Sequence, residues 1–450
     1  MNDVLIPVLV IITLLIFKIP ELGLVLCILA SVFIKEFIQP ALGALDLTGY
    51  LYVVTYGSIA IRKAVTERSI QLPPLGINLT IYLFIFVLLV SVLYSPFTES
   101  AIGAFLRFAL LEISILYMTF LWASNIERIK KLLYIFSGLS IAYSLVSLFL
   151  VQTGIIVSSP LAAVPVGVYY TNVGIFLAAS ILMILVLKEL SQSSSKRSLL
   201  VLLALLSLIA LVATNARGSL IAFSSGVALL LLYSSSQMKR RFFKVVLPLG
   251  IVTFIAFLIL PGKYTARYAL LFNPTSTTVA WRLSAWQLVL DHFSDWFFGG
   301  AGMLGFTIYH PDFIGTVATN VPVFGANPHN LILDVFTRTG FGGLLIFAWL
   351  ISYLLYLGIR ISRLRDNTFC VLGTATFIAL FTFLVDAMFN RSLLTTRPIW
   401  FFAGLILSLW RLWKRNEVGA VGRKLDPQCT KARVASVVRL PREKRRDQSG

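Results

Sequence analysis

The chain has 450 residues, of which 58% are hydrophobic and only 13% are charged, and its mean hydropathy is +0.89. Soluble domains carry roughly a quarter charged residues, so this composition excludes a string of soluble domains and also a disordered chain. The three cysteines form no CxxC or Cys/His cluster, and the sequence therefore indicates neither a metal site nor a disulfide framework. We predict one all-α, polytopic membrane domain without a cofactor.

Apolar stretches of about 18 residues mark helices that cross a bilayer. On this criterion we predict about 12–13 transmembrane helices, because the first and third stretches are short and either count fits. The predicted spans are residues 4–17, 21–38, 44–61, 77–95, 101–123, 132–151, 171–187, 199–215, 217–233, 245–260, 330–357, 369–388 and 398–413. The side of the membrane on which the N-terminus lies is left open by these two counts.

Lysine and arginine are concentrated in alternate loops. These basic segments lie near 62–76, 124–131, 188–198, 234–244 and 358–368, and after residue 411. The positive-inside rule places them in the cytoplasm, so the net charge of +19 mainly reflects topology. No basic domain with interleaved aromatic residues is present, and we expect no nucleic-acid partner. Residues 414–450 are polar and basic, which predicts a disordered cytoplasmic tail near anionic membrane lipid.

One long external loop, residues 261–329, precedes the last three spans. Loops of this length are uncommon unless they are functional or disordered, and the many aromatic residues here argue against disorder. All three histidines of the chain lie in it: His292, His310 and His329. An apolar stripe at helical spacing predicts a helix that lies on the bilayer surface, forms the wall of a substrate site, or does both. The stripe consists of Val279, Leu283, Trp286, Leu290 and Phe293.

Motifs for nucleotide chemistry are missing: GxxxxGK[ST], DxD, HExxH and GxSxG do not occur. Chemistry on the external face would therefore need a substrate that is already activated. Arg217 lies in a tight turn between two spans, and Arg282 lies on the predicted loop helix. Arginine binds phosphate oxygens bidentately, so converging arginines could hold a diphosphate and stabilise it as a leaving group. The alternative for each arginine is a position at the membrane interface.

His329 directly precedes a span in the segment ANPHNLILDVF, at the external mouth of a helix. A neutral imidazole at this position could accept a proton from a hydroxyl nucleophile. The alternative is a histidine that caps the helix or lies at the interface. His310 and His292 are weaker candidates, because one precedes a proline in a turn and the other lies on the loop helix.

Three acidic residues lie within predicted spans, and for all three we favour structural pairing over catalysis. Glu112 is expected to pair with Arg107, Asp386 with Arg391, and Asp334 with Arg338 four residues along its helix.

Three local patterns then resemble those of a known family. The first is Arg217 and Gly218 in NARGSLIAF. The second runs from Arg282 through Trp286 to GGAGMLGF, with Gly300, Gly302 and Gly305. The third is PHN with His329 and Asn330, followed by a span that contains Gly340 and Gly343. In this order they resemble the O-antigen ligase and O-antigen polymerase superfamily of bacterial envelope glycosyltransferases. The patterns cover about residues 200–350.

The resemblance implies a metal-independent, inverting transfer of a glycan from undecaprenyl diphosphate to a hydroxyl acceptor. It implies that His329 is the base and that Arg217 and Arg282 bind the diphosphate. Arg267, Arg338 and Asn330 are further candidates for substrate binding. The expected location is a bacterial inner (plasma) membrane, with the C-terminus in the cytoplasm and the active site on the periplasmic or external face. We expect N-terminal helices over 1–200, a catalytic membrane region over 200–413 and the tail over 414–450.

Several alternatives follow from the same residues. In a ligase the acceptor is lipid A–core sugar, and in a polymerase it is the end of another glycan. A polymerase could also bind a chain-length regulator. A related variant would transfer the glycan to protein. A transporter or flippase of lipid-linked glycan is the main alternative class, but transporters favour charged midplane sites and internal repeats. A structural partner in an envelope assembly would not need His329. The polar residues gathered at one face favour the enzyme.

Overall fold

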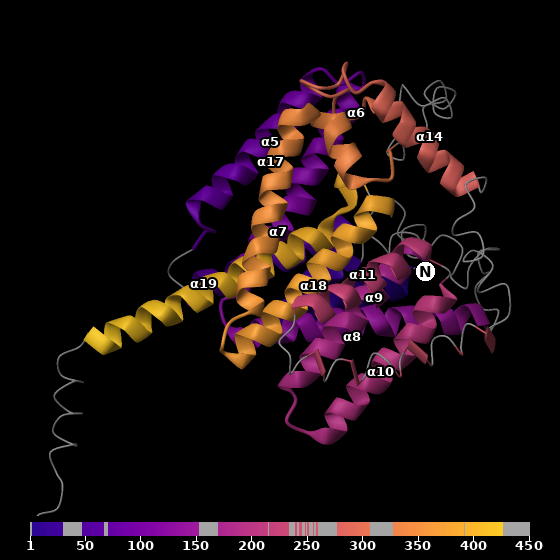
Figure 1. Ribbon diagram of the computed structural model, residues 1–450. Coiled ribbons are helices and arrows are strands. Elements are labelled where there is room, and N and C mark those ends of the chain that lie inside the picture. Colours follow the sequence, from indigo (N-terminus) through magenta and orange to yellow (C-terminus); the bar gives the residue numbers. More distant parts are fainter. Residues whose placement is uncertain are drawn as a thin grey trace, which may run out of the picture.

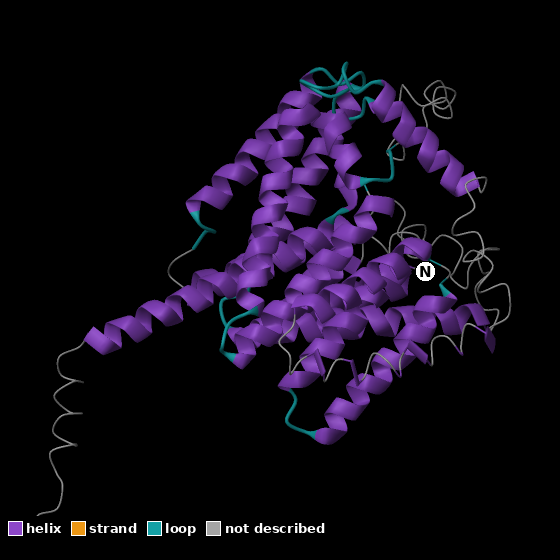
Figure 2. Ribbon diagram, in the orientation of Figure 1, coloured by secondary structure: helices purple, strands orange, loops and turns teal. Residues whose placement is uncertain are grey.

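A computed structural model describes residues 2–29, 47–66, 71–152, 170–214, 216–233, 277–306, 327–390 and 392–425, with isolated positions between 239 and 259. Every regular element in these ranges is a helix (Figure 2). Seven of the described helices are long and apolar enough to cross a membrane. The prediction of an all-α, polytopic membrane protein is therefore confirmed. The predicted span at 245–260 and the loop segments 261–276 and 307–326 lie largely or wholly outside the described residues.

In the described residues, the N-terminal half has six helical segments. They are α1 (Asn2–Lys18), α2 (Pro20–Leu29), α4 (Leu47–Thr66), α5 (Leu75–Leu93), the continuous series of α6 (Thr98–Arg107), the π-helical turn η2 (Phe108–Ile113) and α7 (Ser114–Trp122), and then α8 (Ile126–Gln152). The C-terminal half consists of α9 (Tyr170–Leu187), the short η3 (Lys188–Leu190), α10 (Ser194–Ala213), α11 (Arg217–Tyr233), α14 (Thr277–Asp291), α17 (Leu331–Ser362), α18 (Asn367–Asn390), η5 (Leu393–Thr395) and α19 (Arg397–Leu425).

Two helices form the centre of the bundle. The apolar windows of α9 and α18 are 89% and 78% buried inside the protein, whereas those of the other five membrane-length helices are 33–44% buried. The two central helices pack against each other, and α8, α10, α11, α17 and α19 surround them (Figure 1). A helix that is apolar on all sides suits such a central position.

Gly340 interrupts α17 near its start. Its φ of 68° and ψ of −168° are not helical, and only glycine adopts such a conformation at little cost. A Cβ atom at this position would lie 2.8 Å from the carbonyl oxygen of Phe297 and from the nitrogen of Gly299. The N–H of Phe341 donates to that same carbonyl at 2.8 Å. The kink therefore brings the backbone that follows α14 directly against α17.

The glycine pattern after α14 also serves packing. Gly300 and Gly302 have φ values of 74° and 89°. A Cβ atom at Gly300 would lie 2.6 Å from the carbonyl oxygen of Thr337, and one at Gly302 would lie 2.9 Å from Cα of Ser95. The N–H of Met303 donates to the carbonyl of Ser91 at 3.1 Å. The segment is thus wedged between the end of α5 and the start of α17, and its glycines hold the end of α14 in place.

The end of the last helix differs from the sequence-based expectation. The last helix, α19, continues to Leu425, so residues 414–425 of the predicted disordered tail are helical, because lysine, arginine and glutamate extend a helix readily. Residues 426–450 lie outside the described part of the chain. The loop helix predicted from the apolar stripe is confirmed as α14, which lies along the edge of the bundle (Figure 1).

Candidate functional site

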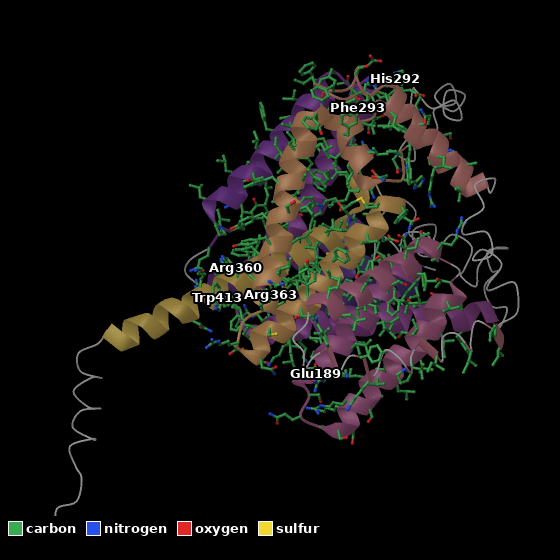
Figure 3. The ribbon with its side chains drawn as sticks, in the orientation of Figure 1. Glu189, His292, Phe293, Arg360, Arg363 and Trp413 are labelled. Atoms are coloured by element: carbon green, nitrogen blue, oxygen red, sulfur yellow. The ribbon has the colours of Figure 1, made fainter. Side chains whose placement is uncertain are left out.

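The three sequence patterns meet at one end of the bundle. Helix α11 begins there, α18 ends there, and α17 begins there after the PHN segment. The opposite end contains the turn between α17 and α18, where the Arg363 guanidinium carbon lies 5.4 Å from the ring centre of Tyr233 at the end of α11. Figure 3 shows His292 and Phe293, which follow α14, far from Arg360 and Arg363. The candidate site is therefore at the end that lies away from these arginines.

Asn390, the last residue of α18, is the centre of this site. Its side-chain oxygen accepts a hydrogen bond from Arg282 Nη2 at 2.9 Å. Its side-chain nitrogen donates to Asp386 Oδ1 at 2.8 Å. Gly218 lies against the same amide, since a Cβ atom at Gly218 would overlap Asn390 Nδ2. Residues from α11, α14 and α18 are thus joined through one side chain.

Asp386 anchors this group of residues to the centre of the bundle. The carboxylate is fully buried, and besides Asn390 it accepts from Ser219 Oγ at 3.4 Å. Ser219 Oγ lies 3.1 Å from the carbonyl oxygen of Thr171 at the start of α9. The expected pairing of Asp386 with Arg391 concerns a residue outside the described part of the chain. Among the described residues, Asp386 is hydrogen-bonded to an amide and to a hydroxyl.

His329 lies beside this network in an unusual backbone conformation. Its φ of 50° is the only positive φ at a non-glycine residue in the described part of the chain. Histidine tolerates this left-handed region better than most residues do, and the His329 N–H donates to Asn327 Oδ1 at 2.9 Å. The imidazole and the Trp281 ring form a T-shaped pair, with ring centres 4.9 Å apart. The imidazole also makes a hydrogen bond with the backbone of Asn390.

The surroundings of His329 keep its imidazole neutral. Burial lowers its pKa below the ordinary value of 6.5, and the positive charge of Arg282 lowers it further. The backbone hydrogen bond with Asn390 and the charge of Asp334 act in the opposite direction, but the net shift is downward. The neutral form is the one that accepts a proton from a hydroxyl. His329 is therefore in the state that a general base requires at neutral pH.

Helix α14 is fixed over the PHN segment by its tryptophans. The indole N–H of Trp286 donates to the carbonyl of Pro328 at 2.8 Å, and Trp281 contacts His329. A small apolar cluster forms beneath the helix from Ala285, Val289, Trp296, Phe306 and Phe336. Arg282 lies between the two tryptophans in sequence. Trp286, which belongs to the predicted stripe, and Trp281, which does not, therefore place Arg282 near His329.

Asn330, a candidate for substrate binding, caps α17. Its side-chain oxygen accepts from the N–H groups of Ile332 at 3.0 Å and Leu333 at 3.2 Å. Such a cap satisfies donors that have no partner inside the helix. The oxygen of Asn330 is thus occupied by the protein and fixes the point where α17 begins, directly after His329.

The expected pair of Asp334 and Arg338 is present. Arg338 Nε and Nη2 donate to the two carboxylate oxygens at 3.0 and 2.9 Å. Nη1 donates to the carbonyl of Met303, and Nη2 also lies 3.3 Å from Ser392 Oγ. All three nitrogens of this buried guanidinium therefore have protein partners. These contacts pack α17 against η5 and the segment after α14, and the candidate role of Arg338 in substrate binding stays a prediction.

Glu112 pairs with a different residue from the one expected. Its carboxylate accepts from Arg397 Nε at 2.8 Å, whereas Arg107 was the expected partner. Both partners are almost completely buried, and Arg397 is the first residue of α19, so a neighbouring helix supplies the neutralising charge. The pairing joins η2 to α19 and is structural, as predicted for the acid itself.

The remaining candidates are placed as follows. Arg217 is the first residue of α11 and directly precedes Gly218, which contacts Asn390. Arg267 and His310 lie outside the described residues. The imidazole of His292 stacks on Trp296 at 5.1 Å and contacts Asp295 at 3.1 Å. In the ranges that the structure describes, no group of three or more His, Cys, Asp or Glu could hold a metal ion.

Comparison with known proteins bears on the part of the chain that forms this site. The model of the family described as O-Antigen ligase matches residues 202–348. The matched segment contains Arg217, Arg282 and His329, and it ends before Asn390. No curated protein matches the chain. The protein is a polytopic, all-α membrane protein, and the resemblance of this segment to the O-antigen ligase superfamily is confirmed.

Asn390 was not predicted from the sequence. An asparagine at the end of an apolar span is typical of a helix terminus, and nothing in its neighbourhood distinguishes it. The one available signal was the acidic residue Asp386 four positions earlier, which must have a polar partner when it is buried.

Proposed function

We propose that the protein is a membrane glycosyltransferase of the O-antigen ligase or polymerase type. It moves a glycan from an undecaprenyl-diphosphate carrier to a hydroxyl acceptor, without a metal ion. The observation that carries this proposal is the meeting of Arg282 and the neutral imidazole of His329 at Asn390. Both residues lie within the segment that matches the O-antigen ligase family. A cation that suits a diphosphate thus lies close to a base that suits a hydroxyl.

The reaction can be written with these residues alone. The His329 imidazole takes the proton of the acceptor hydroxyl, and the oxygen attacks the anomeric carbon of the glycan. The bond from that carbon to the diphosphate oxygen breaks, and its electron pair stays on the leaving diphosphate. Arg217 and Arg282 stabilise the negative charge that develops there. Attack from the side opposite to the leaving group inverts the anomeric centre.

Binding of the donor also prepares the base. The positive charge of Arg282 lowers the pKa of His329. A diphosphate held by Arg282 brings negative charge close to the imidazole, and nearby negative charge favours the protonated form. The bound donor therefore makes His329 a stronger base at the moment when a proton must be removed. The free protein keeps the imidazole neutral and ready.

The distribution of charge supports an external site. The lysine- and arginine-rich segments mark the cytoplasmic side, and the site lies away from Arg360 and Arg363 (Figure 3). We accordingly place the active site on the periplasmic or external face of a bacterial plasma membrane, with the C-terminus in the cytoplasm. Lipid A–core sugar or the end of a glycan would be the acceptor. The product separates a ligase from a polymerase, whose action a chain-length regulator would modulate.

The test uses purified protein in liposomes with an undecaprenyl-diphosphate-linked oligosaccharide and candidate acceptors. Release of undecaprenyl diphosphate and glycan transfer are followed, with and without EDTA. We expect release to survive EDTA and to fall by about 10²–10⁴-fold in His329→Ala, because a general base contributes that much. His292→Ala is the matched control, since His292 contacts Trp296 and Asp295. Wild-type release by folded His329→Ala would reject the proposal, and passage of intact donor across the bilayer would favour a transporter.

A further inference from the structure

We propose that Asn390 is a positioning residue that holds Arg282 at the site without neutralising its charge. This inference rests on the proposed function, because it assigns a role within the same diphosphate-binding site. Asn390 lies outside the segment that matches the ligase family. Its role is visible only in the contacts that it makes with three other helices or loops.

The orientation of the Asn390 amide is determined by its two partners. Arg282 has only N–H donors, and the carboxylate of Asp386 has only acceptors when ionised. The amide oxygen therefore faces Arg282 at 2.9 Å, and the amide nitrogen faces Asp386 at 2.8 Å. A reversed amide would lose both hydrogen bonds. The buried carboxylate of Asp386 thus orients the Asn390 amide, and the amide in turn orients Arg282.

The amide keeps a carboxylate one step away from the guanidinium. A direct pair between Arg282 and Asp386 would bring opposite charges together and reduce the attraction of Arg282 for an anionic ligand. A neutral amide accepts the hydrogen bond from Arg282 and adds no negative charge at that contact. Asp386 still fixes the amide, because hydrogen bonds to ionised groups are stronger than those between neutral groups. Asn390 and Asp386 thereby fix the position of the guanidinium, and Arg282 keeps its positive charge for an anionic ligand.

The same residue also sets the distance between the cation and the base. The imidazole of His329 hydrogen-bonds with the backbone of Asn390, while Arg282 binds its side chain. Gly218 lies directly against the amide, so a Cβ atom at this position would overlap Asn390 Nδ2. A shift of Asn390 would move Arg282 relative to His329. In the proposed transfer Arg282 faces the diphosphate of the donor and His329 faces the acceptor hydroxyl, so the distance between them must suit both substrates.

Two charged groups on the described elements act on the pKa of His329, Arg282 on α14 and Asp334 on α17. Asp386 on α18 lies behind Asn390, and Arg217 begins α11. Asp334 is paired with Arg338, so its effect is partly compensated. A carboxylate introduced at position 390 would be a new negative charge next to both Arg282 and the imidazole.

The decisive variants are Asn390→Asp, Asn390→Leu and the double variant Asp386→Asn/Asn390→Asp. The double variant has the same number of carboxylates as the wild type and can keep a hydrogen bond between the two positions, but its carboxylate faces Arg282. We expect both variants with an aspartate at position 390 to raise the donor KM by roughly tenfold or more, because the new ion pair competes with the diphosphate. Asn390→Leu, which removes the hydrogen bond to Arg282, should lower kcat/KM.

A second measurement follows His329 itself. Nuclear magnetic resonance of histidine-labelled protein in detergent gives the pKa of each imidazole, and His292→Gln and His310→Gln assign the signals. We expect the two variants with an aspartate at position 390 to raise the pKa of His329 by about one pH unit, because a nearby carboxylate favours the charged imidazole. Asn390→Leu has no new charge and should not produce that rise. Thermal unfolding shows whether each variant is folded.

The outcomes separate the two proposals. If the wild type transfers glycan and both variants with an aspartate at position 390 keep its donor KM and its His329 titration, the role of Asn390 is rejected. The double variant could instead keep the donor KM and the His329 titration of the wild type while Asn390→Asp changes both. The number of carboxylates would then matter and their position would not, and the role of Asn390 is again rejected. If the wild type releases no undecaprenyl diphosphate, the proposed function fails, while the His329 titration still tests the contact between Asn390 and the imidazole.

Discussion

Two arginines at this end of the bundle have different environments. Arg338 follows Asp334 by four residues on α17, and Asn390 follows Asp386 by four residues on α18. In the first case Arg338 donates directly to the carboxylate of Asp334 and forms an ion pair with it. In the second case the Asn390 amide donates to the carboxylate, and its oxygen accepts a hydrogen bond from Arg282 on α14. The same spacing therefore produces a closed ion pair on one helix and an arginine held by a neutral amide beside the other.

The difference lies in what each arginine can do. Arg338 is 5% exposed and its nitrogens bind Asp334, Ser392 and Met303, so it holds α17 in place. Arg282 is half-buried on a helix at the edge of the bundle and adjoins the imidazole of His329. Substitution of Arg338 should therefore affect stability, and changes around Arg282 should affect catalysis.

The largest effect on stability is expected for Arg338→Met. Removing the guanidinium leaves the buried carboxylate of Asp334 without a counter-charge, and such a loss costs about 3–5 kcal/mol. The midpoint of thermal unfolding in detergent should fall clearly. Asp334→Asn/Arg338→Met is the matched control, because the amide oxygen still accepts from Leu393 N–H, which lies 2.8 Å from the Asp334 carboxylate. That double variant should recover much of the stability. An unchanged midpoint in Arg338→Met would contradict the closed pair.

A change at Gly218 should affect catalysis without a comparable effect on folding. An added methyl group at this position overlaps the end of the Asn390 side chain, which can rotate away at small cost. Rotation breaks the hydrogen bond to Arg282, and small misplacements of such groups cost about tenfold to a hundredfold in rate. Release of undecaprenyl diphosphate and thermal unfolding are measured for Gly218→Ala. Gly342→Ala is the matched control, because its methyl group would meet no atom within 4 Å. Equal rates for the two variants would contradict the role of this contact.

The sequence predicted the fold and part of the site for different reasons. Hydropathy alone marks membrane helices, and the apolar stripe through Trp286 correctly predicted α14. His329 and Arg282 were found because they lie in short local patterns. Asn390 was missed because its importance arises from packing between helices.

Ion pairs between segments far apart in the sequence could not be predicted either. Glu112 and Arg397 are 285 positions apart, and nothing in either segment indicates the other. The pair of Asp334 and Arg338 was predicted because both residues lie on one helix at a spacing that brings side chains together. Local periodicity therefore predicts contacts within a helix, whereas contacts that build a site from several helices depend on the three-dimensional arrangement.

The smallest expected effect is on the pH dependence of kcat/KM, which should respond differently to substitution of Arg282 and of Arg338. The pKa of His329 lies below 6.5, so kcat/KM should rise with pH through that lowered pKa, as the imidazole loses its proton, and should be level at neutral pH. In Arg282→Gln the residual activity should show the same rise moved to higher pH by less than about one pH unit, because the positive charge is gone. Burial, the larger cause of the lowered pKa, persists, so the rise should stay below the ordinary histidine range.

The control is Asp334→Asn/Arg338→Met, and each profile is normalised to its own plateau. The rise in kcat/KM of this control should keep its pH or move to slightly lower pH, because a negative charge near His329 is removed. Activity that falls from pH 5 to 7 would show that a protonated group is required and would remove His329 as the base.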